Sequence, residues 1–304
     1  MRYVLICLVL LAAACGGRPK QPAETAAAPR VFLPAVAPSQ IPLEERFEWI
    51  RWHYWDTFDF ADTLFLAQAD TTQLLQAYAN YIAILSFRPT DGAPVDSLMR
   101  KASVSRPMLD YFVWLADEVV HDPNSPLRND EFYIPVLEAQ LASPWYDEYE
   151  RIRPAYELKI ALQNRVGQPA NDFRYTLASG ATGRLYGLRS EYVLLFINNP
   201  GCPMCREIRE AIVESPMLTE LIERGSLTVL ALYPDEDLAE WHNHAAEIPS
   251  NWINAYDAGC HIEAESLYSL RAIPSLYLLD RNKRVLVKDS VEVAEIEEAI
   301  DRAQ

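Results

Sequence analysis

The spacing of hydrophobic residues divides the chain into two halves of different character. From about residue 41 to residue 166, apolar residues recur at intervals of three and four, as at Leu74, Tyr78, Ile82 and Leu85. This spacing gathers them on one face of an α-helix. Turn-forming stretches such as RPTDGAP and HDPNSP separate the repeats. The pattern therefore predicts an all-α helical domain over residues 41–166.

Short apolar runs replace the helical spacing after residue 167. YVLLFIN and LTVLALYP have the length of buried strands, and an amphipathic stretch follows each of them. The first of these stretches predicts a helix with a break at Pro216. Further along, SLYLLD and RVLVKD predict two strands around a turn at RNK, and EVAEIEEAIDRA predicts a closing helix. Strands that alternate with helices predict an α/β domain over residues 167–304, with a mixed sheet covered on both faces.

The N-terminus has the features of an export signal. Arg2 precedes an apolar run from Tyr3 to Ala14, which is shorter than the roughly 20 residues that span a bilayer but suits a signal-peptide core. The run ends in LAAAC, which resembles the signal of bacterial lipoproteins, whose cysteine becomes the first residue of the mature chain and carries lipid. The resemblance implies a signal peptide over residues 1–14 and lipid attachment at Cys15. An ordinary secretory signal is the alternative.

The same resemblance places the mature protein on the bacterial cell envelope, anchored by lipid to a membrane and facing the periplasm or the exterior. Residues 15–40 contain five prolines, at positions 19, 22, 29, 34 and 38, with many alanines between them. A stretch of this composition is not expected to bury a core. It predicts an extended tether between the membrane and the helical domain.

Composition and charge exclude some classes of partner. The chain has 304 residues, enough for two domains at roughly 150 residues each, and half of its residues are hydrophobic. Its formal net charge of −16 comes with no basic stripe that could neutralise nucleic-acid phosphates. We therefore expect no nucleic acid among its partners, and a solvated acidic surface that keeps the protein soluble.

The stretch GCPMC carries the strongest chemical signal. Cys202 and Cys205 follow a predicted strand and open a predicted helix. At a helix N-terminus, unpaired backbone N–H groups and the positive end of the dipole stabilise a thiolate, which is the nucleophile that attacks a disulfide. Cys205 lies three residues later on the same helix face, where it can release the mixed disulfide. The spacing predicts a two-step exchange in which Cys202 attacks and Cys205 resolves.

Other uses of two such cysteines are less well supported. A zinc site would need two or more further ligands. The candidates are His242, His244, Cys260 and His261. The first two are two residues apart in a predicted helix and point to different sides, and no second C-x-x-C exists. We therefore expect no metal and no cofactor, and an inert structural disulfide stays as an alternative. We expect Cys260 to be a buried apolar residue, with a third redox cysteine or an intermolecular bridge as alternatives.

Three features of residues 167–304 together resemble the thioredoxin superfamily. They are the opening GQPANDF, the CPMC that follows a strand, and RAIPSLYLLD. The likeness is greatest to the membrane-tethered thiol-disulfide oxidoreductases of the bacterial envelope. It implies that Cys202 and Cys205 are the catalytic pair. It also implies that Pro274 is a cis-proline that faces the pair and, with Ile273 before it, helps to bind an extended substrate.

The resemblance also implies the partners. They are envelope proteins with cysteine thiols or disulfides, and a separate, unidentified redox partner that recharges the pair. Reduction or isomerisation of disulfides is the direction we expect. In the first half, HYWDTFDFADT resembles a helical domain of unknown function that precedes thioredoxin-like domains in some envelope lipoproteins, and it implies no chemistry. We expect its aromatic residues to form a core, and a groove for a peptide or glycan is the alternative.

The sequence departs from the family in the group that would move a proton. Many thioredoxins bury an acid on the strand six residues before the first cysteine, where this chain has Phe196. Some envelope relatives place a glutamate three residues after the second cysteine, where this chain has Ile208. Glu207 and Glu210 lie nearby and are candidate general bases. The alternative for both is a solvated helix face.

Two other functions remain open alongside a membrane-anchored thiol-disulfide oxidoreductase. Thiol peroxidases of this superfamily carry a threonine three residues before the attacking cysteine, where this chain has Asn199. A non-catalytic binding lipoprotein would hold a ligand in its aromatic helical half and use the thioredoxin-like half as a scaffold. Because a fold does not fix a function, an assay of disulfide reduction is needed to separate the three.

Overall fold

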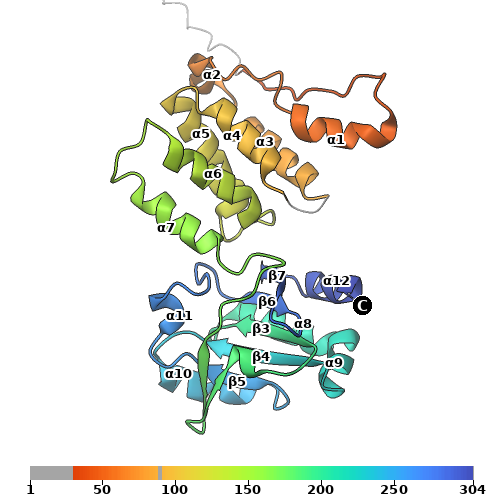
Figure 1. The fold of residues 1–304 in the computed structure, drawn as a ribbon, viewed down its shortest axis with the longest axis vertical. Coiled ribbons are helices and arrows are strands. Elements are labelled where there is room, and N and C mark those ends of the chain that lie inside the picture. The colour runs from red at the N-terminus through yellow and green to blue at the C-terminus, as the bar shows by residue number, and fades with distance from the viewer. Residues whose placement is uncertain (1–29, 88–90, 304) are drawn as a thin grey trace, which may run out of the picture.

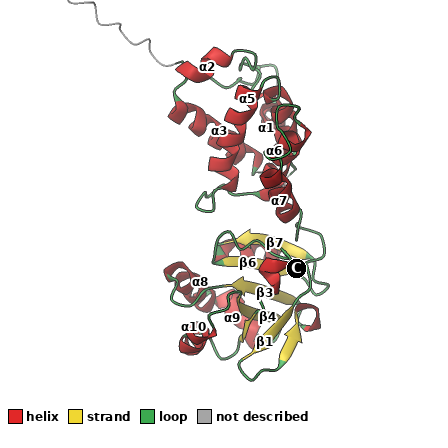
Figure 2. Cartoon of the chain, turned by 90° about the vertical axis from the view of Figure 1, so that its left-hand side faces the viewer, coloured by secondary structure: helices red, strands yellow, loops and turns green. Residues whose placement is uncertain are grey.

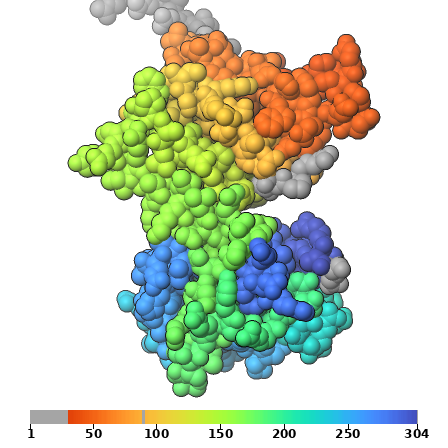
Figure 3. Space-filling model, in the orientation of Figure 1, coloured from red at the N-terminus to blue at the C-terminus, as the bar shows by residue number. Residues whose placement is uncertain are grey.

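The computed structural model describes residues 30–87 and 91–303. Within these ranges the chain forms a helical domain followed by a domain built on a seven-stranded sheet, which we call the sheet domain (Figure 1). Figure 2 shows all the strands in the lower of the two lobes, and Figure 3 shows the lobes in contact. The predicted signal peptide and Cys15 lie outside the described residues. In the ranges described, no helix has both the length and the hydropathy that a membrane crossing requires.

Eight helical segments build the described part of the helical domain. They are α1 (Leu43–His53), α2 (Thr63–Gln68), α3 (Thr71–Leu85), α4 (Ala93–Ala102), α5 (Arg106–Ala116), the π-helical turn η1 (Asp117–His121), α6 (Asp130–Ala142) and α7 (Ile152–Ala161). Polar side chains cap several of them, as when Asp70 accepts from the amide of Gln73 at the start of α3, and Ser105 and Asn129 begin α5 and α6. The predicted all-α domain is confirmed.

The aromatic stretch after α1 forms the centre of this domain's core. Trp55 is 3% exposed and meets the rings of Phe58 and Phe112 edge to face, with centroids 5.9 and 5.3 Å away. Such aromatic pairs stabilise the fold beyond the area that they bury. Core packing was therefore the right expectation for these rings, since their burial leaves them unable to line a groove.

The predicted tether is wrong for residues 30–35. Phe32 is 3% exposed and stacks on Trp55, with ring centroids 4.6 Å apart. The side chain of Gln73 accepts from the N–H of Phe32 at 3.1 Å and donates to its carbonyl at 2.7 Å. One buried Phe side chain contributes about 1.5–3 kcal/mol, which is enough to fasten a short segment despite its prolines. The helical domain therefore includes this segment instead of starting at residue 41.

The sheet of the second domain has the strand order β2-β1-β5-β4-β3-β6-β7. The strands are β1 (Arg174–Leu177), β2 (Thr182–Arg184), β3 (Tyr192–Ile197), β4 (Leu227–Tyr233), β5 (Ile253–Tyr256), β6 (Ser275–Leu279) and β7 (Val285–Ser290). The three strands β3, β4 and β5 run parallel to one another, and every other pairing is antiparallel. The predicted mixed sheet and its β6–β7 hairpin are confirmed.

Helices and loops cover both faces of this sheet. They include α8 (Pro203–Glu214), α9 (Pro216–Glu223), α10 (Leu238–Asn243), α11 (His261–Ala264), α12 (Val293–Ala303) and the short 3-10 turns η2 (Leu185–Gly187) and η3 (Ala245–Glu247). All of β3 is buried, and its alternate residues, such as Leu194 and Leu195, belong to separate apolar clusters on the two faces. The predicted break at Pro216 falls between α8 and α9.

Candidate functional site

One edge of the sheet gathers the loops that carry the candidate residues. Ile197 at the end of β3 pairs with Leu232 of β4, which in turn pairs with Ala255 of β5. On its other side Ile197 pairs with Ser275, the first residue of β6. The loops that follow β3 and β5 and the loop that precedes β6 therefore leave the sheet at the same edge. These loops contain the C-x-x-C, Cys260 and Ile273–Pro274 respectively.

Cys202 is the N-cap residue of α8. Its sulfur accepts a hydrogen bond from the backbone N–H of Cys205 at 3.3 Å, and Pro203 takes the first helical position. Proline suits that position because its missing N–H would have no partner there. Cys202 is partly exposed, and its sulfur lies at the positive end of the helix, where a thiolate is a better acceptor than a thiol.

Cys205 lies on the buried side of the same helix. It is 3% exposed and shares the apolar face of α8 with Ile208 and Ile212. Burial raises the pKa of the Cys205 thiol, and the neighbouring Cys202 raises it further, whereas the backbone N–H of Asn199 and the charge of Arg209 act the other way. The pair is therefore asymmetric, with one partly exposed cysteine at the helix terminus and one buried cysteine a turn behind it.

The loop before β6 borders the cysteine pair. The Ile273–Pro274 peptide bond is cis, as the resemblance implied. Ile273 and Cys202 both pack against the apolar cluster that contains Cys205. The structure thus brings together four of the predicted site residues, which come from two segments about seventy positions apart in the sequence.

The two candidate general bases lie elsewhere. Glu207 and Glu210 are both exposed, and their spacing from Cys205 places them on the outward side of α8. Phe196, at the position where many relatives bury an acid, is 1% exposed and packs edge to face on Trp252. Among the described residues, therefore, no carboxylate that the sequence suggested faces the buried thiol.

Two residues near the buried thiol were not singled out for it by the sequence. The backbone N–H of Asn199 donates to the sulfur of Cys205 at 3.4 Å, and its side-chain oxygen is buried without a hydrogen-bond partner. Arg209, held by Glu247 at 2.9 Å, places a positive charge near the same sulfur. The position of Arg209, four residues after Cys205 on the predicted helix, is the sequence feature that could have indicated this proximity.

Cys260 differs from the buried apolar residue that the sequence suggested. It is only partly buried, and it precedes α11 in the left-handed region with φ 52°. Burial raises the pKa of its thiol, and the negative charges of Asp257 and Glu236 add to the effect. In the part of the chain that the structure describes, no cluster of three histidine, cysteine or acidic side chains could hold a metal ion.

Known proteins share both the fold and the two-domain plan. A family described as a domain of unknown function, DUF5106, matches residues 16–164. The crystal structure of a thioredoxin-like protein from Bacteroides caccae is 43% identical with a TM-score of 0.84, and the match covers 90% of this chain and 99% of that one. Since this match spans both domains, the two proteins place them similarly. The chain belongs to the thioredoxin-like proteins and carries the DUF5106 domain ahead of its thioredoxin fold.

Other similar structures cover the sheet domain alone. The C-terminal domain of an uncharacterized protein from Bacteroides fragilis is 46% identical with a TM-score of 0.44, covering 45% of this chain and 98% of that chain. The thioredoxin domain of a thiol-disulfide oxidoreductase from Bacteroides vulgatus is 17% identical with a TM-score of 0.38, covering 46% and 97%. No curated protein matches the chain.

Proposed function

We propose that the protein is a membrane-anchored thiol-disulfide oxidoreductase that exchanges disulfides with envelope proteins through Cys202 and Cys205. The observation that carries this proposal is the asymmetry of the pair. Cys202 is partly exposed and its sulfur accepts a hydrogen bond from a backbone N–H at a helix terminus, whereas Cys205 is buried one turn behind it. A reactive cysteine needs that exposure and that positive environment, whereas both sulfurs of an inert structural disulfide would be buried.

The chemistry proceeds in two exchanges. The Cys202 thiolate attacks a disulfide of the substrate, forms a mixed disulfide and releases one substrate thiolate, which takes up a proton. Cys205 then loses its proton and attacks the Cys202 sulfur, which releases the second substrate thiolate. The substrate gains two electrons and the protein keeps a Cys202–Cys205 disulfide. A separate dithiol protein must return two electrons for the next cycle. When another thiol of the substrate, in place of Cys205, attacks the mixed disulfide, Cys202 is released reduced and the substrate disulfide is rearranged without net electron transfer.

Reduction of insulin by excess dithiothreitol tests the proposal. The full chain in detergent should shorten the lag before insulin precipitates, and Cys202→Ser should abolish this effect. Cys260→Ser is the matched control, because it removes a partly buried thiol that the exchange does not use. A wild-type protein with no effect on insulin, or an active Cys202→Ser variant, would overturn the proposal.

The two alternatives have less support. A binding lipoprotein would need aromatic residues that line a groove, but Tyr54, Trp55 and Phe58 are buried in the core. A thiol peroxidase would need a hydroxyl where Asn199 stands. Peroxide consumption without insulin reduction would favour a thiol peroxidase over a thiol-disulfide oxidoreductase.

A further inference from the structure

Charged side chains that are almost fully buried join the two domains. Lys288 Nζ of β7 lies 2.8 Å from Asp130 Oδ2 at the start of α6, and Arg128 Nη2 lies 3.5 Å from Asp289 Oδ1. These four side chains are 8–10% exposed. Arg271, in the loop before β6, adds a contact of 3.4 Å to Asp130. We call these five residues the interdomain charge network.

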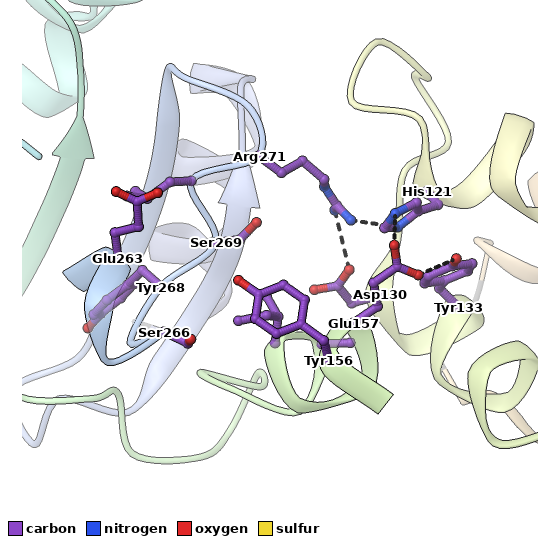
Figure 4. Close-up of a pocket in the computed structure, with 13 residues that line it drawn as sticks. His121, Asp130, Tyr133, Tyr156, Glu157, Glu263, Ser266, Tyr268, Ser269 and Arg271 are labelled. Atoms are coloured by element: carbon purple, nitrogen blue, oxygen red, sulfur yellow. Dashed lines mark hydrogen bonds and ion pairs between the residues drawn. The ribbon is translucent and has the colours of Figure 1, made fainter. Parts of the chain in front are cut away.

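The interdomain charge network contacts both ends of segment 271–275, which borders the cysteine pair. At one end Arg271 Nη1 donates to His121 Nδ1 of the helical domain at 2.6 Å (Figure 4). At the other end the hydroxyl of Ser275 donates to Asp289 at 2.7 Å, and Arg128 donates to the carbonyl of Asp289. Segment 271–275 is therefore held at its first and last residues by groups that the helical domain supplies or engages.

Apart from these polar contacts, the segment is fixed by Ile273, which packs against two apolar clusters, and by the burial of Pro274. Within the described residues, no backbone hydrogen bond ties residues 271–274 to the sheet, since the ladder of β6 starts at Ser275. The apolar clusters also stop at the domain boundary, because none of the three contains residues from both domains. Polar side-chain contacts are therefore the main connection between the two domains. A segment with few backbone hydrogen bonds depends on such contacts for part of its order.

A pocket lies beside Arg271 at the boundary between the two domains. This pocket of about 360 Å³ separates the loop before β6 from α6 and α7, with Tyr156 and Ser269 on opposite walls (Figure 4). Figure 4 shows the guanidinium of Arg271 reaching across from the sheet domain to His121 and Asp130. The side chain of Arg271 therefore reaches the helical domain beside open space.

The members of such a network depend on one another. Burial favours the protonated form of Asp130, but Lys288 and Arg271 outweigh that effect and hold its pKa below the usual value. Removing one partner from a buried ion pair leaves the others uncompensated in a poorly solvated site, which costs far more than the pair contributes. A change on the helical domain is therefore felt in the segment beside the cysteines.

We propose that the helical domain holds segment 271–275 in place beside the cysteine pair, with Arg271 and Asp130 as positioning residues for disulfide exchange. Ile273 lies two positions after Arg271, a span of at most about 7 Å, so a shift of the bridge reaches directly the residue that we expect to contact the substrate. The inference rests on the proposed function, and it gives the DUF5106 domain a role: it sets the geometry of the thioredoxin site without contributing a reacting group.

The test compares Arg271→Gln, Asp130→Asn and their double variant in the full chain. Each single change should lower kcat/KM for insulin reduction about tenfold, because misplacement of substrate slows reaction. The double variant should be no slower than the slower single variant, since both changes break one bridge. Arg271→Lys should recover part of the rate, and Arg224→Gln, which changes an exposed arginine at the C-terminal cap of α9, should match the wild type.

Two further readouts separate positioning from general damage. Alkylation of Cys202 should keep its wild-type rate in Arg271→Gln, because the bridge does not touch the sulfur. Hydrogen exchange of the first amides of β6, at Ser275 and Leu276, should become faster, while that of β3 stays slow. Wild-type exchange and wild-type kcat/KM in Arg271→Gln would overturn the inference, and so would strictly additive losses in the double variant. If the wild type reduces no insulin, the proposed function fails, and the hydrogen exchange measurement alone decides the positioning role.

Discussion

Replacing Phe32 with alanine removes a ring that is 3% exposed and contacts both Trp55 and Phe58. Truncation of a buried Phe costs about 3–5 kcal/mol of unfolding free energy. We expect the lower end, about 3 kcal/mol, because a short segment can move to close part of the cavity. If the helical domain loses about 2 kcal/mol of stability per molar urea, its unfolding midpoint should fall by about 1.5 M.

Tryptophan fluorescence is the suitable probe, because five of the seven tryptophans precede residue 167 and the signal reports chiefly on the helical domain. Leu33→Ala is the matched control, since Leu33 lies in the same segment but is 73% exposed. It should change the unfolding free energy by less than about 0.5 kcal/mol. A loss below about 1 kcal/mol in Phe32→Ala would refute the burial of this ring, because surface substitutions produce changes of that size.

Three further predictions concern cysteines. Cys205→Ala removes the resolving thiol, so envelope proteins should accumulate on Cys202 as adducts that a reductant releases on a gel; adducts that persist without Cys202 would contradict the assignment. Cys15→Ser should move the protein from the membrane fraction to the soluble fraction, and an unchanged distribution would rule out the lipid anchor. The reduced protein should lose stability as the pH rises above about 8.5, because Cys205 ionises in the unfolded chain while burial raises its pKa in the folded one. The Cys205→Ala variant should lose less stability over this range, with Cys260 still contributing, and equal pH curves for the two proteins would disprove the cause.

The cysteine site was largely predictable because its information is local. A buried strand, a helix start and two cysteines three positions apart lie within fourteen consecutive residues, Tyr192–Cys205, and each follows from short-range rules. The observed β3 ends one residue before the predicted strand, and Cys202 caps α8 as its position required. Ile273 and Pro274 were found only through the resemblance, since nothing in local spacing ties them to a pair seventy residues away.

The parts that sequence reasoning missed depend on contacts between distant positions. Arg128 and Asp289 are 161 residues apart, and each alone resembles an ordinary surface charge. Their burial exists only because two domains meet there. Phe32 was missed for a different reason: prolines dominated the composition of its segment, and one aromatic residue does not change an average. Glu207 and Glu210 were chosen by proximity in sequence, which does not distinguish the two sides of a helix.

The burial of Phe32 has a consequence for how far the protein can work from a membrane. If Cys15 is the anchored residue, 17 peptide units separate it from Phe32, at most about 60 Å, instead of the 25 units and about 90 Å that would separate it from residue 40. The volume open to the start of the helical domain scales with the cube of that reach, so it is about threefold smaller. The local concentration of that point near the membrane rises by the same factor. Membrane-bound partners at that depth would meet it more often, and proteins farther out would lie beyond its range.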